Sequence, residues 1–233
     1  MAVKVGLTAL VVLFAVGLVL YIVMGSDKKG GSTQAVRVAS DSLVKKEGTE
    51  EPKAVLAIYE DFQCPHCRDF EKKFGPTVAK LIDSGAAAVD YYMLSILNRV
   101  NSGYSSRAAN AAYCVADENM DAFKRFHSAL FAQQPQEGSG SGPDNAALIE
   151  TARQAGVTGG VPECINKGTY EKMTKGLAAA TKVSSTPTIR LNGQDINPAS
   201  PDELLAKVRA VVGPMPALAP TPAPAPPAPA TAP

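Results

Sequence analysis

The stretch AVLAIYEDFQCPHC, residues 54–67, decides the fold. Its first part, residues 55–59, is a continuous apolar run, which is typical of a strand covered on both faces. Cys64 and Cys67 follow, and Pro65 between them suits the first position of a helix. The stretch therefore predicts a buried strand that leads directly into a helix beginning at a Cys-x-x-Cys pair.

The spacing of the two cysteines indicates redox chemistry. Positions i and i+3 at a helix start can bring the two Cα atoms within the ~7 Å that a disulfide requires, so the bond can open and reclose. As the helix N-cap, Cys64 would face free N–H groups and the helix dipole, which stabilise a thiolate. His66 can add a positive charge or a hydrogen bond to the same sulfur. We predict a strongly lowered pKa for Cys64, with Cys67 deeper and titrating later.

Two other interpretations of this pair stay open. A Cys-x-x-Cys pair can be half of a zinc site, but structural zinc normally has a second pair at similar spacing, and Cys114 and Cys164 stand alone. A purely structural disulfide is common in proteins outside the cytoplasm. The position directly after an apolar strand favours the redox interpretation, and we expect no metal and no cofactor.

The four cysteines allow three pairings. If Cys64 and Cys67 pair with each other, Cys114 must pair with Cys164. That bond would close a loop of about 50 residues and stabilise the fold by about 4 kcal/mol in the chain-entropy treatment. It would also imply an oxidising compartment.

Both ends of the chain predict segments outside the folded domain. Residues 5–24 carry no charge and, at about 1.5 Å per residue, would span the ~30 Å hydrocarbon core of a membrane. We expect a single transmembrane anchor over 1–24, with a cleavable secretory signal as the alternative. A flexible linker over 25–40 would follow, placing the catalytic domain outside the cytoplasm. The Pro/Ala-rich residues 213–233 predict a disordered tail.

The charge balance argues against a nucleic-acid partner. The chain has 23 basic and 22 acidic residues, and no basic stripe with interleaved aromatic residues stands out along it. Nucleic-acid binding would require such a stripe or patch.

The domain itself predicts an α/β architecture interrupted by helices. Its first part, 41–98, contains the strand, the Cys-x-x-Cys helix and a second, parallel strand within 86–97. Gly75-Pro76 should kink or break that helix, because proline removes a hydrogen bond. A helical insertion over 99–182 follows, with helices expected at 108–116, 120–131, 146–155 and 169–181.

The closing part, 183–212, begins with Thr186-Pro187 and a strand over 188–191. Asn192-Gly193 is a strong hairpin signal, and Pro201 suits the start of a last helix.

Two further features of the insertion have plain structural interpretations. His127 shares a helical face with four apolar side chains, which favours a packed core or rim histidine over a functional one. The glycine-rich loop 136–144 lacks the strand and the Lys-Ser/Thr pair of a phosphate-binding loop, so a flexible surface loop is the better interpretation.

This order of elements resembles a thioredoxin fold with the helical insertion of the DsbA-like thiol-disulfide oxidoreductases. The resemblance covers about residues 40–212 and is most specific in YEDFQCPHC, residues 59–67, while the anchored form resembles actinobacterial members. It implies a dithiol oxidase that exchanges disulfides with the thiols of unfolded secreted proteins. It also implies reoxidation by a quinone-linked thiol oxidase in the membrane.

The resemblance also implies a substrate site. Pro187 would be a cis-proline facing the cysteines, and Thr186 would offer its backbone to an extended substrate by strand addition. Six residues before Cys64, where the family commonly has a buried acid, this chain has Ile58, and Glu60 is the candidate substitute. Threonine before the cis-proline also occurs outside the strongest oxidases, so isomerase and reductase activity stay open. A redox-inert interaction module at the cell surface is the rival hypothesis.

Overall fold

The computed structural model describes residues 34–157 and 159–214. The predicted anchor, most of the predicted linker and nearly all of the Pro/Ala-rich tail lie outside these ranges. Within them, none of the helices has the length and apolar character needed to cross a bilayer.

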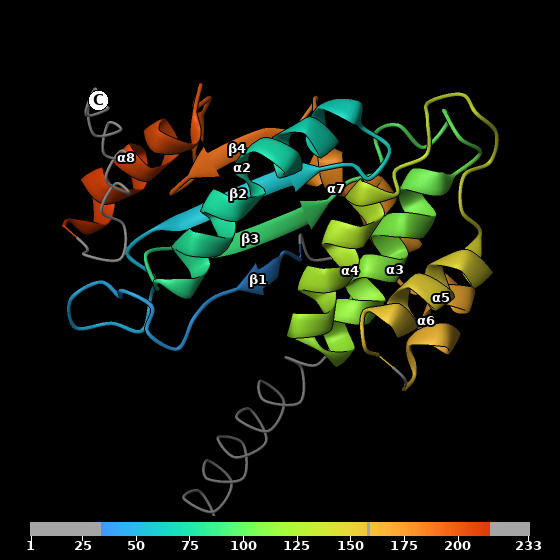
Figure 1. Ribbon diagram of the computed structural model, residues 1–233, viewed down its shortest axis with the longest axis horizontal. Helices are drawn as coiled ribbons and strands as arrows, with labels where there is room; N and C mark the ends of the chain where they lie inside the picture. Colours follow the sequence, from blue (N-terminus) through green and yellow to red (C-terminus); the bar gives the residue numbers. More distant parts are fainter. Residues whose placement is uncertain (1–33, 158, 215–233) are drawn as a thin grey trace, which may run out of the picture. The chain divides into compact units, whose positions relative to one another are not determined.

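A five-stranded mixed sheet forms the centre of the domain (Figure 1). Its order is β1-β3-β2-β4-β5, and only β2 and β3 run parallel. The predicted parallel pair is therefore confirmed. The bounds are β1 (Val36–Val38), β2 (Val55–Glu60), β3 (Ala88–Met93), β4 (Thr188–Leu191) and β5 (Gln194–Ile196).

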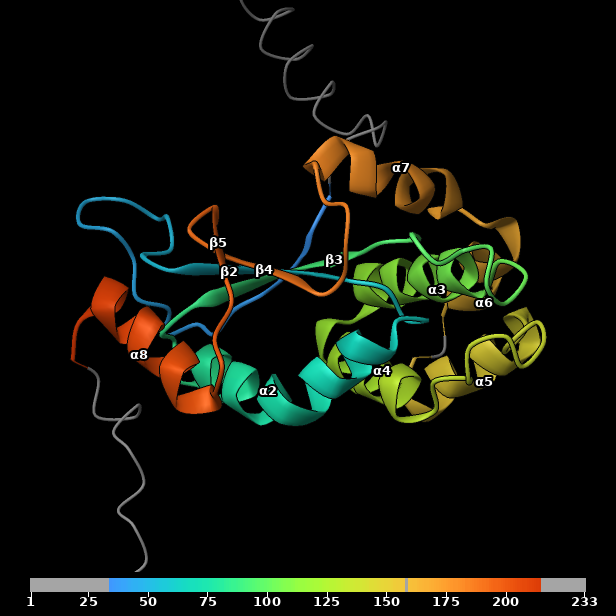
Figure 2. The ribbon, with the colours of Figure 1, turned by 90° about the horizontal axis from the view of Figure 1, so that it is seen from above.

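Helices cover both faces of this sheet. Figure 2 shows α2 (Pro65–Asp83) and α8 (Pro201–Val212) on one side and α7 (Glu171–Thr181) on the other. The central strand β2 is buried along almost its whole length, which explains why its sequence is apolar rather than alternating. Its carboxyl end points directly to the start of α2.

Helix α2 runs without interruption from Pro65 to Asp83. Of the two outcomes expected at Gly75-Pro76, the structure excludes the break. Proline removes one backbone hydrogen bond, whereas buried side chains on both sides of Pro76 keep the helix on the sheet. They are Phe70, Phe74, Val78 and Leu81.

Two turns with positive φ angles border strands of the sheet. Gly85 ends the α2 connection at φ 71°, and a Cβ atom there would lie 2.2 Å from the Ser42 carbonyl oxygen, so the position requires glycine. Asn192 and Gly193 both have positive φ, 49° and 83°, and join β4 to β5 as the predicted hairpin.

The insertion is helical, as predicted, and lies beyond one end of the sheet. The sequence missed its shortest helix, because seven residues do not give a readable 3.6-residue period. The helices described within 99–182 are α3 (Tyr104–Glu118), α4 (Met120–Ala132), α5 (Asn145–Gln154), α6 (Val161–Lys167) and α7, which is the helix expected at 169–181.

The predicted end of the linker at residue 40 is wrong, because the folded domain begins before it. Residues 36–38 form β1, which pairs antiparallel with β3 at the edge of the sheet. Val36 and Val38 face inward and are buried, while Arg37 reaches across to the Asp90 carboxylate with two hydrogen bonds of 2.6 and 2.7 Å. Three residues with one alternation are too short a pattern to read as a strand from sequence.

Candidate active site

Cys64 is the N-cap of α2 and Pro65 is its first residue, as the sequence predicts. The turn between β2 and α2 is fixed by Asp61, whose carboxylate accepts hydrogen bonds from the backbone N–H groups of Gln63 (2.9 Å) and Leu97 (2.8 Å). These contacts hold the backbone that presents Cys64 at the end of the sheet.

Gln134, just after α4, also holds this turn. Its side-chain amide donates hydrogen bonds to the carbonyl oxygens of Phe62 and Cys64, each at 2.9 Å. The insertion is thereby attached to the residues around the cysteine pair. The sequence analysis missed Gln134, because a glutamine 70 residues from Cys64 carries no local signal.

Thr186 and Pro187 lie against Cys64. The Cys64 Sγ atom donates a hydrogen bond to the Thr186 carbonyl oxygen at 3.3 Å, although the two residues are 122 positions apart. The Thr186–Pro187 peptide bond is cis, as the family resemblance implied. Both side chains are partly exposed, so solvent and a second molecule can reach this face of the cysteine pair.

Cys64 and Cys67 are both free thiols, so the structure describes the reduced pair. A hydrogen bond from the Cys67 side chain is the main cause that lowers the pKa of Cys64 to about 6, helped by the Thr186 side chain and by backbone N–H groups at Cys67 and His66. Burial opposes this effect.

Burial is also the main cause that raises the pKa of Cys67 far above its usual range, with further contributions from the charges of Cys64 and Glu60. The opposite directions of the two pKa shifts agree with the prediction that Cys64 titrates before Cys67, although both thiols are buried. The contribution of His66 in the structure comes from its backbone, since the side chain is exposed. A role for its imidazole stays a prediction.

We expect the rate at which Cys64 is alkylated in the reduced protein to follow the fraction of Cys64 that is thiolate. The dependence of this rate on pH should have its midpoint near pH 6. The rate should fall as pH drops through this value, since the thiol form is unreactive. Because the folded pKa lies below the ordinary value of about 8.5, the stabilisation of the reduced protein by this thiolate is full above about pH 8.5 and is lost as pH falls through 6.

Iodoacetamide kinetics and ultraviolet thiolate absorbance would measure that midpoint. The Cys64→Ser variant serves as the control, because it should show no transition in the same range. A midpoint near the ordinary value of a free cysteine, about 8.5, would contradict the lowered pKa.

Glu60 is a buried acidic residue near Cys67. Ile58, which stands where the family commonly has its buried acid, is an apolar core residue. The Glu60 carboxylate is fully buried and contacts His127 Nε2 in a hydrogen-bonded pair. His127 is itself buried among aromatic rings, as its helical face predicted, but its pairing with Glu60 was not predicted. The rings belong to Phe62, Tyr91, Phe123 and Phe131.

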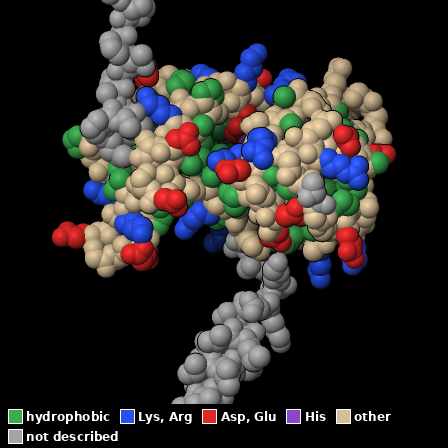
Figure 3. Space-filling model, turned by 60° about the horizontal axis from the view of Figure 1, so that its bottom comes forward, with side chains coloured by type: hydrophobic (Ala, Val, Ile, Leu, Met, Phe, Trp, Pro, Cys, Tyr) green, Lys and Arg blue, Asp and Glu red, His purple; other side chains and the backbone are tan. Residues whose placement is uncertain are grey.

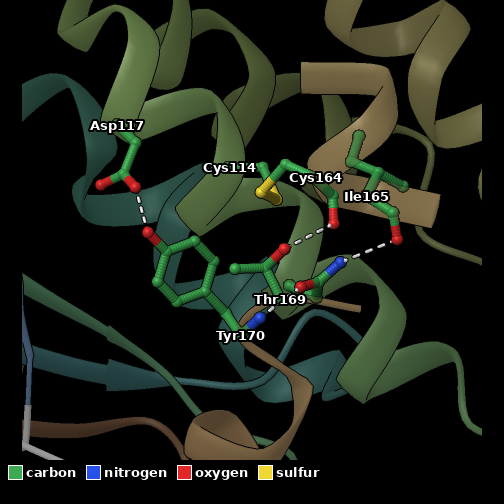
Figure 4. The surroundings of a disulfide bond; sticks show 7 residues. Cys114, Asp117, Cys164, Ile165, Thr169 and Tyr170 are labelled. Atoms are coloured by element: carbon green, nitrogen blue, oxygen red, sulfur yellow. Dashed lines mark hydrogen bonds between the residues drawn. A yellow bond between two sulfur atoms is a disulfide. The ribbon is translucent and has the colours of Figure 1, made fainter. Parts of the chain in front are cut away.

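Cys114 and Cys164 form a disulfide that joins α3 to α6, which confirms the predicted pairing (Figure 4). Around it, Thr169 donates a hydrogen bond to the Cys164 carbonyl oxygen at 3.1 Å, and Tyr170 contacts Asp117. Because both cysteines are already bonded, they cannot supply the second pair of a zinc site with Cys64 and Cys67.

Comparisons with known proteins agree with this geometry. A family model described as Thioredoxin matches residues 45–210. The chain is 53% identical to the reduced DsbA of Mycobacterium tuberculosis, with a TM-score of 0.76 over 79% of this chain and 95% of that one. The oxidised form of that DsbA gives 55% identity and a TM-score of 0.77, over 79% of this chain and 96% of that one.

More distant relatives share only parts of this similarity. The MdbA thiol-disulfide oxidoreductase from Corynebacterium matruchotii, at 24% identity and a TM-score of 0.61 over 71% of this chain and 84% of that one, supports the fold alone. The serine/threonine-protein kinase PknE of M. tuberculosis is 30% identical over 138 residues, 57% of this chain. The match spans only about a quarter of that kinase, 24% of its length.

The fold, the Cys-x-x-Cys pair at the start of α2 and the cis-proline beside it therefore agree with the close similarity to a solved DsbA over nearly its whole length. The chain belongs to the thioredoxin family and, within it, to the DsbA-like thiol-disulfide oxidoreductases.

Proposed function

We propose that this chain is a dithiol oxidase that introduces disulfide bonds into unfolded secreted proteins outside the cytoplasm. The observation that carries the proposal is the lowered pKa of Cys64, about 6, in a reduced pair that faces Thr186 and the cis-proline. A thiolate that is stable in the reduced protein favours reduction of the protein and hence oxidation of its substrate.

The size of this preference follows from the pKa. Relative to an ordinary thiol near 8.5, a pKa of about 6 stabilises the reduced form at pH 7 by about 1.4 kcal/mol, which corresponds to about 30 mV. This stabilisation of the reduced form is smaller than the one that a Cys64 pKa near 4 would give. It supports an oxidant of intermediate strength, more oxidising than thioredoxin, whose pKa is about 7.

The proposed exchange has two steps. A substrate thiolate attacks the Cys64 sulfur of the Cys64–Cys67 disulfide, and Cys67 leaves with the bonding electrons and takes up a proton. The second substrate thiol loses its proton and attacks the substrate sulfur of the mixed disulfide, which releases Cys64 as a thiolate. Two electrons thus pass from the substrate dithiol to the cysteine pair, and the substrate gains one disulfide.

An unfolded polypeptide suits the surface beside the cis-proline. A cleft of about 340 Å³ lies there, lined by aromatic side chains of α2 and by both apolar and polar residues on the β4–β5 side. An extended segment bonded to the Thr186 backbone could place a side chain in it. The residues include Phe70, Phe74, Pro187, Ile196 and Pro198.

We also propose that the protein is a single-pass membrane protein, reoxidised by a quinone-linked thiol oxidase in the same membrane. The uncharged residues 5–24 and the Cys114–Cys164 disulfide support this location. Nucleic acid is not proposed as a partner. On the face drawn in Figure 3, acidic and basic side chains are interspersed and form no basic stripe.

The reduction potential of Cys64/Cys67, measured on the full chain in glutathione buffers, tests the proposal. We expect a value more positive than the about −270 mV of thioredoxin, by at least the ~20 mV that a Cys64 pKa of about 6 in place of about 7 gives at pH 7. A value near about −270 mV would instead indicate a reductase that requires an electron donor. The absence of any reversible transition would favour the redox-inert interaction module.

A further inference from the structure

We propose that Glu60, Glu71 and His127 form a binding site for one divalent transition-metal ion of the zinc type. The three side chains come from β2, α2 and α4. One ligand atom of each, two carboxylate oxygens and an imidazole nitrogen, lies within 4.8 Å of the other two. The site adjoins Cys67 through Glu60 but uses no sulfur ligand.

Two buried oxygens at this site lack partners among the described residues. Glu60 is fully buried, and although its Oε1 atom contacts His127, its Oε2 atom has no hydrogen-bond partner. Glu71 Oε1 is also a buried atom without a partner. An unsatisfied buried acceptor costs about 1–3 kcal/mol and more if it is charged. A bound cation would satisfy both oxygens at once.

The charge of the cluster also favours a cation. The cluster combines two carboxyl groups with one imidazole in a buried environment. A divalent ion bound by two carboxylates and a neutral imidazole leaves no net charge.

The neighbouring titratable groups do not supply that positive charge. Cys67 and Tyr91 are buried neighbours, and neither side chain can carry a positive charge. Arg68, Lys72 and Lys124 line the same cleft, but their side chains are exposed, where water and salt screen them.

An ion can reach the site from solvent. A cleft of about 780 Å³ lies between α2 and α4, and both Glu71 and His127 line it. Zinc commonly binds three protein ligands and keeps one position for water, which the cleft would provide. Tetrahedral ligands at about 2.1 Å from zinc lie about 3.4 Å apart, so an ion would have to enter between the Glu60 and His127 atoms that now contact each other and separate them. Glu71 and His127 would present their ligand atoms from the wall of this cleft.

The ligand set selects among metals. Zinc binds imidazole nitrogen and carboxylate oxygen at about 2.0–2.2 Å, whereas calcium and magnesium prefer oxygen ligands alone. We therefore expect zinc and cobalt(II) to bind, and millimolar calcium or magnesium not to displace them.

The test must remove the thiols, because a reduced Cys-x-x-Cys pair can itself bind zinc. We would titrate ZnCl₂ into the full-length Cys64→Ser/Cys67→Ser protein by calorimetry and expect one ion per chain. Adding Glu71→Gln should weaken the affinity at least tenfold. Asp69→Asn is the matched control, since Asp69 is an exposed carboxylate in the same helix and cleft but outside the cluster, and it should leave the affinity unchanged.

Cobalt(II) provides a second measurement that needs no variant at the cluster. Bound to the Cys64→Ser/Cys67→Ser protein, cobalt(II) should show the d–d absorption bands that are typical of nitrogen and oxygen ligands. It should show no thiolate charge-transfer band. The proposal is overturned if no stoichiometric zinc binds, if a folded Glu71→Gln variant binds as tightly as its parent, or if calcium displaces cobalt.

Discussion

The Cys64→Ser variant is expected to lose the oxidation of a dithiol peptide, with a fall of at least about 10³-fold to the uncatalysed background. The reason is the position of Cys64. Its sulfur borders Thr186 and the cis-proline, while Cys67 is fully buried behind it. A serine oxygen cannot form the mixed disulfide, and Cys67, with its raised pKa, cannot replace the lost thiolate.

Cys67→Ser is the matched control, because it removes the other sulfur of the same pair. A mixed disulfide introduced at Cys64 has no neighbouring thiol to resolve it in this variant, so labelled substrate should accumulate on the protein. Unchanged turnover in Cys64→Ser would contradict the assignment of the cysteine pair. Failure of Cys67→Ser to accumulate labelled substrate would show that the order of attack is wrong.

The elements around the active site could be predicted because each has a local signature. The apolar run before Cys64, the proline at the first helical position and the Asn192-Gly193 turn each restrict the backbone within a few residues. The order of these elements then indicated the fold, and the family resemblance supplied the cis-proline. The observed β2, α2 and β4–β5 hairpin follow these patterns closely.

The contacts that tune the site could not be predicted, because they join residues far apart in sequence. Glu60 and His127 are 67 positions apart, and strand alternation alone could not place the Glu60 carboxylate beside Cys67. The Gln134 contacts that attach the insertion to the turn before Cys64 likewise depend on how α4 ends. The edge strand β1 and the helix α6 were too short for their periodicity to be read.

Removal of the second disulfide should lower stability and leave activity intact. The Cys114–Cys164 bond spans 50 residues, and in the chain-entropy treatment its loss costs about 4 kcal/mol. For a domain of this size that corresponds to a fall in Tm of about 8–16 °C. The Cys114→Ala/Cys164→Ala variant, compared with the unmodified protein by calorimetry and by peptide oxidation, would measure both effects.

Activity should survive because the two pairs make different contacts. The Cys114–Cys164 bond joins α3 to α6, whereas the backbone around Cys64 is held by Asp61 and by Gln134 at the end of α4. Below its new Tm the variant should therefore keep the lowered pKa of Cys64 and its rate of exchange. A loss of activity measured well below that Tm, in a variant that is still folded, would mean that the second pair takes part in electron transfer.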